Sequence, residues 1–151
     1  MNILVSDTPR EGILRLTMDD QKSGNALSEE MMSILIKAIE KASIDDSVKV
    51  IILAAEGSIF SSGHNLKQIT DARKQSEDGE PYFKQLFDQC SSLMRLLVNC
   101  PKPVIAQISG IATAAGCQLV ATCDLAYASS SAKFATPGVN LGLFCSTPMV
   151  A

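Results

Sequence analysis

The sequence lacks tryptophan, and aromatic residues fill only 5% of its 151 positions. Hydrophobic residues still make up 46% of the chain, so its core must be built mainly from aliphatic side chains. A chain of this length is expected to form one domain, which we place over residues 1–151. No apolar run reaches the roughly 20 residues of a membrane span, and we expect no membrane partner.

Clusters of basic residues are absent as well, and the formal net charge is −3, which argues against nucleic acid as a partner. The five cysteines form no C-x-x-C pair, so the sequence predicts neither a zinc site nor a disulfide framework, and we expect no metal. The N-terminus has the pattern of neither a secretory signal nor a transit peptide. Together with free thiols, this predicts a cytoplasmic location.

Strand and helix patterns alternate along the chain. Ser28 has the position of a helix N-cap, and Leu27 and Met32 have the spacing of a hydrophobic staple. Pro81 suits the first turn of a later helix, and residues 71–79 before it read as a mobile polar loop. Expected strands cover residues 3–6, 13–18, 48–54, 104–108 and 125–128, and residues 132–144 are expected to form a strand and a loop. Expected helices start after Ser28, end the segment 55–69, run from Pro81 to Asn99 and cover residues 115–122. This alternation predicts an α/β fold with parallel strand pairing.

Two loops of small residues share one design. "SSGHNL" follows the strand at 48–54, "GIATAAG" follows the strand at 104–108, and each leads into a helix. Ligands bind at the carboxyl ends of strands in such sheets, and the N–H groups at a helix start are unpaired. Two such groups could stabilise a ligand oxygen that becomes negative during reaction. Close packing of a helix against a strand is the alternative reason for small residues here.

The residues of these loops resemble known motifs. "GSIFSSGHNLKQI" resembles the G-x-x-F-x-[AS]-G-x-D-[LI]-K segment of the crotonase (enoyl-CoA hydratase/isomerase) superfamily, and "KPVIAQISGIATAAGCQLVATCDLAYAS" resembles its K-P-V-I-A-x-[IV]-x-G-x-A-x-G-G-G-C-E-L-x-x-x-C-D segment. "NALSEEMM" and "VKVIILAAEG" resemble its earlier blocks. The resemblance implies a crotonase-like ββα spiral core that binds acyl-CoA, is incomplete at its C-terminus and lacks the C-terminal helical trimerisation region.

The same resemblance implies a site for an acyl-CoA thioester whose carbonyl oxygen is held by the backbone N–H groups of His64 and Ala115. Asn65, Leu66 and Lys67 fall where the family holds the CoA moiety, and no cofactor is expected beyond the CoA of the substrate. His64 is the only histidine, so its imidazole is a candidate general base. The alternative is that only its N–H matters. A trimer-type homo-oligomer is expected for full-length members but not for this shortened chain.

Two family glutamates are missing, because their positions hold Gln118 and Gly138. Neither residue exchanges a proton at neutral pH, and hydration needs an acid and a base, so we expect weak or absent hydratase activity in an enoyl-CoA hydratase/isomerase family protein. Whether the chain is an active enzyme stays open. The alternatives are decarboxylation of a malonyl-type CoA thioester, a non-catalytic CoA-thioester binding module, or a truncated non-functional product with exposed apolar faces.

Overall fold

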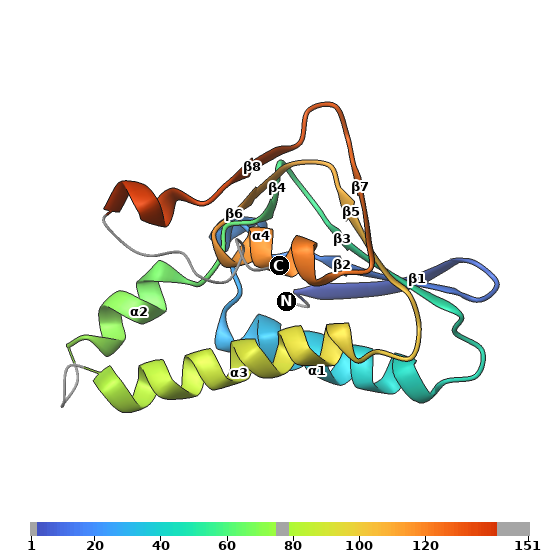
Figure 1. Cartoon of the computed structure of the whole chain (residues 1–151), viewed down its shortest axis with the longest axis horizontal. Helices are drawn as coiled ribbons and strands as arrows, with labels where there is room; N and C mark the ends of the chain where they lie inside the picture. Colours follow the sequence, from blue (N-terminus) through green and yellow to red (C-terminus); the bar gives the residue numbers. More distant parts are fainter. Residues whose placement is uncertain (1–2, 75–78, 142–151) are drawn as a thin grey trace.

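The computed structural model describes residues 3–74 and 79–141 of the chain. The predicted helices and strands appear in the predicted order, and two short strands that were not predicted lie among them (Figure 1). The elements are β1 (Leu4–Arg10), β2 (Ile13–Met18), α1 (Glu29–Ile44), β3 (Val50–Ala55), β4 (Ile59–Ser61), α2 (Leu66–Ala72), α3 (Glu80–Val98), β5 (Val104–Ile108), β6 (Ile111–Thr113), α4 (Ala115–Thr122), β7 (Leu125–Ala128) and β8 (Lys133–Ala135), with short 3₁₀ turns at Gln21–Ser23 and Pro137–Leu141.

The strands form two sheets. The larger has the order β1-β2-β3-β5-β7, in which β1 is antiparallel to β2 and the other pairs are parallel. The smaller has the order β4-β6-β8, all parallel. The chain therefore visits the larger sheet and then the smaller one three times, through β3–β4, β5–β6 and β7–β8. This repeat confirms the predicted α/β class with parallel pairing.

Helices α1 and α3 lie side by side below the sheets, and α4 sits between them and the smaller sheet (Figure 1). Helix α1 starts where predicted, because Ser28 Oγ accepts a hydrogen bond from Met31 N at 3.1 Å. At its other end, the Lys102 ammonium donates to the carbonyls of Ala42 and Asp45, which satisfies acceptors that the helix leaves free. The staple residues are fully buried, as the spacing predicted: Leu27 and Met32.

The core is aliphatic, as the composition predicted. Its largest fully buried side chains include only one aromatic residue among the described ones, Phe60 on β4. The others are leucine, isoleucine and methionine from the larger sheet, from α1 and α3 and, for Leu27, from the loop before α1. No helix within residues 3–74 and 79–141 is long and apolar enough to cross a membrane.

The structure corrects the predicted elements in three places. Strand β1 continues to Arg10 instead of ending at Ser6, and strands β4 and β6 were not predicted. Helix α2 continues to Ala72, so the predicted mobile loop at 71–79 begins as a helix, and its positions 75–78 lie outside the described residues. A run of large apolar side chains is exposed after α4: Leu125, Tyr127, Phe134 and Val139.

Candidate functional site

The two small-residue loops meet at the ends of β4 and β6, which are paired in parallel. Thr113 Oγ1 donates to the Ser62 carbonyl at 3.1 Å and joins the loops directly. A Cβ atom on Gly63 would stand 3.0 Å from Ala114 Cβ and 3.1 Å from Ala115 N. Gly63 also has a φ of +85°, which disfavours any side chain. Only glycine at this position allows the backbones of the two loops to come so close.

The second loop reaches α4 through an unusual backbone conformation. Ala114 has a φ of 50° and a ψ of −123°, which is rare for a residue with a side chain. Its N–H donates to the Ala135 carbonyl at 2.9 Å, and its own carbonyl accepts from Cys117 N at 3.0 Å. These bonds from both sides hold the conformation. The next residue, Ala115, then starts α4, so its N–H lies in the first turn, where helical N–H groups have no acceptor within the helix.

Helix α4 lies directly on the smaller sheet. A Cβ atom on Gly116 would stand 2.4 Å from the Ser61 carbonyl oxygen, so a larger residue would push the helix away from β4. Ala115 is 9% exposed, which places its N–H in a largely water-free setting. The positive end of the α4 dipole is thus fixed beside the first loop.

A cavity of about 440 Å³ opens beside the first loop. The predicted CoA-binding residues Asn65, Leu66 and Lys67 line it together with His64, so the structure brings these four together. Sequence reasoning missed the remaining lining residues, which lie before α1 and at the end of β4: Asp20, Lys22, Ser23, Ala26 and Ser62. Lys22 and Lys67 add two cationic side chains to the cavity and Asp20 adds one carboxylate. The cationic groups outnumber the acidic one, which favours an anionic group such as a phosphate.

The His64 side chain turns toward α3. Its ring packs edge-on against Phe87, with ring centroids 5.8 Å apart and planes at 82°. Its Nδ1 atom is buried and has no hydrogen-bond partner among the described residues. Burial lowers the pKa of His64, and the Leu27 carbonyl opposes that shift in part. The imidazole is therefore neutral at pH 7.

Two asparagines hold the loops in place. Asn65 is the N-cap of α2, and its Oδ1 accepts from Lys67 N at 3.0 Å and Gln68 N at 3.2 Å. Asn25, in the loop before α1, is fully buried. Its amide group donates to the Glu56 and Ile59 carbonyls, at 2.9 and 2.7 Å, and its Oδ1 accepts from Asp20 N at 2.7 Å. The sequence offered one signal for this role, because Asn25 is the first residue of the "NALSEEMM" block that resembles the family.

The positions of the two missing glutamates lie in different elements. Gln118 is half-buried on α4, one turn after Ala115, and Gly138 lies in the 3₁₀ turn at Pro137–Leu141. Ala135, just before that turn, is tied to the start of α4, because its carbonyl accepts from Ala114 N and from Cys117 Sγ. Ala115, Gln118 and Gly138 do not line the 440 Å³ cavity.

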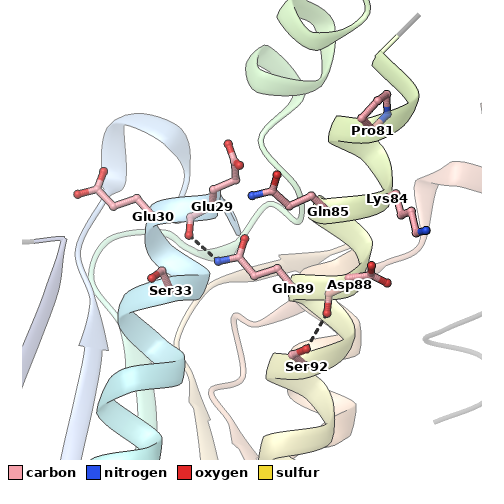
Figure 2. Close-up of a pocket in the computed structure, with 9 residues that line it drawn as sticks. All are labelled: Glu29, Glu30, Ser33, Pro81, Lys84, Gln85, Asp88, Gln89 and Ser92. Atoms are coloured by element: carbon pink, nitrogen blue, oxygen red, sulfur yellow. Dashed lines mark hydrogen bonds between the residues drawn. The ribbon is translucent and has the colours of Figure 1, made fainter. Parts of the chain in front are cut away.

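A larger, open groove of about 800 Å³ lies elsewhere, between α1 and α3 (Figure 2). Polar side chains line it, and Gln89 crosses it to donate to the Glu29 carbonyl at 3.0 Å. None of the predicted site residues borders this groove, so its size does not make it the site. Within the described part of the chain, no three histidine, cysteine, aspartate or glutamate side chains gather in a way that could hold a metal ion.

Comparisons with known proteins match this architecture. The profile of the enoyl-CoA hydratase/isomerase family matches residues 8–150. Enoyl-CoA hydratase domain-containing protein 3 of Xenopus laevis is 51% identical over 140 residues, which is 93% of this chain and 46% of that protein. The human protein of the same name is 49% identical over 141 residues, which is 93% of this chain and 45% of that protein. The chain thus spans about half the length of the curated relatives it matches.

Solved structures give the same result. An enoyl-CoA hydratase of Mycobacterium smegmatis superposes with a TM-score of 0.89 at 44% identity, covering 99% of this chain and 56% of that one. Human enoyl coenzyme A hydratase domain-containing protein 3 superposes with a TM-score of 0.87 at 45% identity, with the same coverage. These neighbours confirm the expected crotonase-like fold of the core.

The expectation of a cytoplasmic location is wrong, because the Xenopus, mouse and human relatives are named as mitochondrial proteins. The physical reason is that compartment addresses are carried by segments separate from the fold, so core composition and free thiols do not report them. The profile match over nearly the whole chain and the similarity to these relatives together establish that the chain belongs to the enoyl-CoA hydratase/isomerase family.

Proposed function

We propose that the chain binds an acyl-CoA thioester and directs the backbone N–H groups of His64 and Ala115 at its carbonyl oxygen. The observation that carries the proposal is the contact between the two loops. The position of a Cβ on Gly63 lies 3.1 Å from Ala115 N, and the His64 N–H follows Gly63 by one peptide bond. Donors from two separate loops can therefore converge on one oxygen atom.

The surroundings of the His64 and Ala115 N–H groups would stabilise negative charge that develops on the thioester oxygen during reaction. Donors stabilise an oxyanion best when they are fixed in place and shielded from water, because little reorganisation is then needed. The backbone of Ala114 donates a hydrogen bond to β8 and accepts hydrogen bonds from α4, and Ala115 is 9% exposed. The first turn of the eight-residue helix α4 adds its partial positive charge. The carbonyl oxygen of an enolising thioester fits this environment.

The CoA moiety fits the cavity beside the first loop. Lys22 and Lys67 both line it together with Asp20, and a CoA phosphate would add negative charge beside the two lysines. The Lys67 carbon chain and the exposed Leu66 offer apolar surface to the pantetheine arm. On this proposal the thioester reaches from the cavity to the backbone N–H groups of His64 and Ala115.

Hydration by this chain should be weak or absent. Gln118 and Gly138 provide no carboxylates, and positioned acid–base groups typically contribute about 10²–10⁴-fold each. Burial lowers the pKa of the His64 imidazole, and the ring packs against Phe87 of α3. Binding, with or without enolate stabilisation, is the activity that these residues support.

A panel of three ligands tests the proposal. We expect butyryl-CoA, crotonyl-CoA and methylmalonyl-CoA each to raise the melting temperature more than CoA alone does, with little hydration of crotonyl-CoA by chromatographic assay. Rapid hydration would contradict the role given to the missing carboxylates. Carbon dioxide release from methylmalonyl-CoA would favour a decarboxylase over simple binding. If no acyl-CoA stabilises the folded protein, the proposal fails.

A further inference from the structure

The direction of each proposed donor is set by the carbonyl of its own peptide group. In a trans peptide the C=O and N–H bonds point in opposite directions, and the described residues contain no cis peptide bond. The Gly63 carbonyl accepts from Leu27 N at 2.8 Å, so the His64 N–H points away from the segment before α1. The Ala114 carbonyl accepts hydrogen bonds from within α4, so the Ala115 N–H points out of the start of that helix.

The spacing between these two donors depends on one side chain. The ladder of paired residues between β4 and β6 ends before either donor is reached. Beyond it, Thr113 Oγ1 donates to the Ser62 carbonyl at 3.1 Å. No other hydrogen bond joins residues 62–64 to residues 113–115 within the described part of the chain. The Thr113 hydroxyl is therefore the polar link between the two segments that carry the donors.

Ser62 is held from its other side as well. Its N–H donates to the Gly24 carbonyl at 3.0 Å, and its Oγ donates to the Ser23 carbonyl at 3.2 Å. Both partners lie in the segment before α1. Without the Thr113 hydroxyl, the first loop would keep these bonds and lose its bond to the second loop. The 440 Å³ cavity would then persist, because the segment before α1 and the first loop line it, while the two donors would move apart.

We infer that Thr113 is a positioning residue of the acyl-CoA site, whose hydroxyl sets the distance between the N–H groups of His64 and Ala115. The inference rests on the proposed function and adds a residue to it. Thr113 does not line the cavity, so loss of its hydroxyl should leave binding of the CoA moiety unchanged. The contribution of the thioester carbonyl should fall, because that oxygen needs both donors at once.

The test compares Thr113→Val, which keeps the shape of the side chain without the hydroxyl, with Thr113→Ser, which keeps the hydroxyl. Isothermal titration calorimetry of butyryl-CoA and of CoA alone gives two affinities, and their ratio isolates the acyl group. We expect Thr113→Val to lower this ratio about fivefold, a typical effect of one hydrogen bond, with unchanged affinity for CoA. Thr113→Ser should keep the ratio of the unchanged protein. An unaltered ratio in Thr113→Val would overturn the inference.

Infrared difference spectroscopy follows the thioester carbonyl directly, with carbon-13 placed at that carbon of butyryl-CoA. Hydrogen bonds weaken a C=O bond, so the band should lie at lower frequency in the unchanged protein and in Thr113→Ser than in the free ligand. In Thr113→Val it should lie closer to its free position. A role in stability alone would leave the band where it is in the unchanged protein, and that result also overturns the inference.

Thr122→Val on α4 is the matched control. Thr122 is half-buried like Thr113, and its Oγ1 donates to the Gln118 carbonyl at 2.7 Å, so the same group is removed away from the loops. We expect this variant to change neither the affinity ratio nor the carbonyl band. Circular dichroism and melting temperature establish that each variant is folded. The same fall in the ratio from both valine variants would contradict a specific role for Thr113.

A measurement without ligand separates this inference from the proposed function. In nuclear magnetic resonance spectra of the free protein, Thr113→Val should shift the His64 amide resonance, whereas Thr113→Ser should leave it nearly in place. If the unchanged protein binds butyryl-CoA no more tightly than CoA, the proposed function fails. If it does bind butyryl-CoA more tightly and the His64 resonance is the same in Thr113→Val, the positioning role alone fails.

Discussion

The amide nitrogen of Ala115 lies 3.1 Å from the point where a Cβ atom on Gly63 would stand. The two residues are 52 positions apart in the sequence, yet no side chain fits between their backbones. Strands β4 and β6 cause this contact, because they run in parallel and end together, so the loops that follow them meet. The proposed site depends on this contact more than on any side chain.

Gly63→Ala should disrupt the site. Its Cβ would press on Ala114 Cβ at 3.0 Å and on backbone atoms of Ala115 and Thr113 at 3.1 Å, at a φ of +85°. We expect a loss of about 2 kcal/mol in the free energy of unfolding and loss of butyryl-CoA binding. Chemical denaturation and calorimetry measure the two effects.

Gly12→Ala is the matched control for that change. Gly12 has a similar φ of +79°, but its Cβ would meet only the flexible Lys49 side chain, at 3.2 Å from Cγ. We expect a similar cost in backbone strain, about 1 kcal/mol, with unchanged ligand binding. Equal effects of both substitutions on binding would refute a special role for the Gly63 contact.

Gln118→Glu should raise crotonyl-CoA hydration only slightly, because one carboxylate cannot serve as both acid and base. Gly138 has no positive φ, so the second carboxylate can be added as Gln118→Glu with Gly138→Glu without backbone strain there. We expect the double variant to exceed the sum of the single variants by about tenfold or more in rate. Full activity from Gln118→Glu alone, followed by ultraviolet absorbance, would contradict this assignment.

The sequence predicts well wherever one residue carries a local signal. Ser28 caps α1 as expected, and Leu27 and Met32 are buried as the staple spacing indicates. It fails on β4 and β6, because strands of three residues are too short to have a period. It also ends β1 too early, since "DTPR" contains turn-forming residues. As an edge strand, β1 tolerates Pro9, and Asp7 pairs with Arg15 across the sheet at 2.7 Å.

Some residues of the candidate site could be predicted from the sequence, and others could not. The motif resemblance points to His64, Asn65, Leu66 and Lys67, and the structure places all four around one cavity. The orientation of a side chain has no local signature, so the packing of His64 on Phe87 could not be predicted. That contact joins residues brought together only by the fold, and the same holds for the lining residues before α1.

Ala114→Gly should stabilise the protein. Ala114 has a φ of 50° and a ψ of −123°, a conformation that costs a residue with a side chain about 1–3 kcal/mol. Glycine adopts it freely but loses about 0.5–1 kcal/mol through its flexible unfolded state. We expect a net gain of about 1 kcal/mol, measured by chemical denaturation.

Ala115→Gly provides the comparison, because Ala115 lies one residue further on, at the start of α4. There glycine relieves no strain, so we expect a loss of about 1 kcal/mol instead of a gain. The same sign for both substitutions would mean that the Ala114 conformation is not strained.

Asn25→Asp should be severely destabilising although it changes only one group. The Asn25 amide donates to the Glu56 and Ile59 carbonyls at 2.9 and 2.7 Å, inside a fully buried site. A carboxylate there would lose both bonds and turn a negative oxygen toward two carbonyl oxygens. We expect a loss of about 3 kcal/mol in the free energy of unfolding at pH 7.

Asn65→Asp makes the same chemical change at a position where only the side-chain oxygen is hydrogen-bonded to the protein. Asn65 Oδ1 already accepts from Lys67 N and Gln68 N at the start of α2, and a carboxylate accepts such bonds at least as well. We therefore expect its free energy of unfolding to stay within about 0.5 kcal/mol of the unchanged protein. Denaturation of the two variants side by side measures the contrast. If Asn25→Asp were as mild as Asn65→Asp, Asn25 would not be the residue that ties the loop before α1 to β3 and β4.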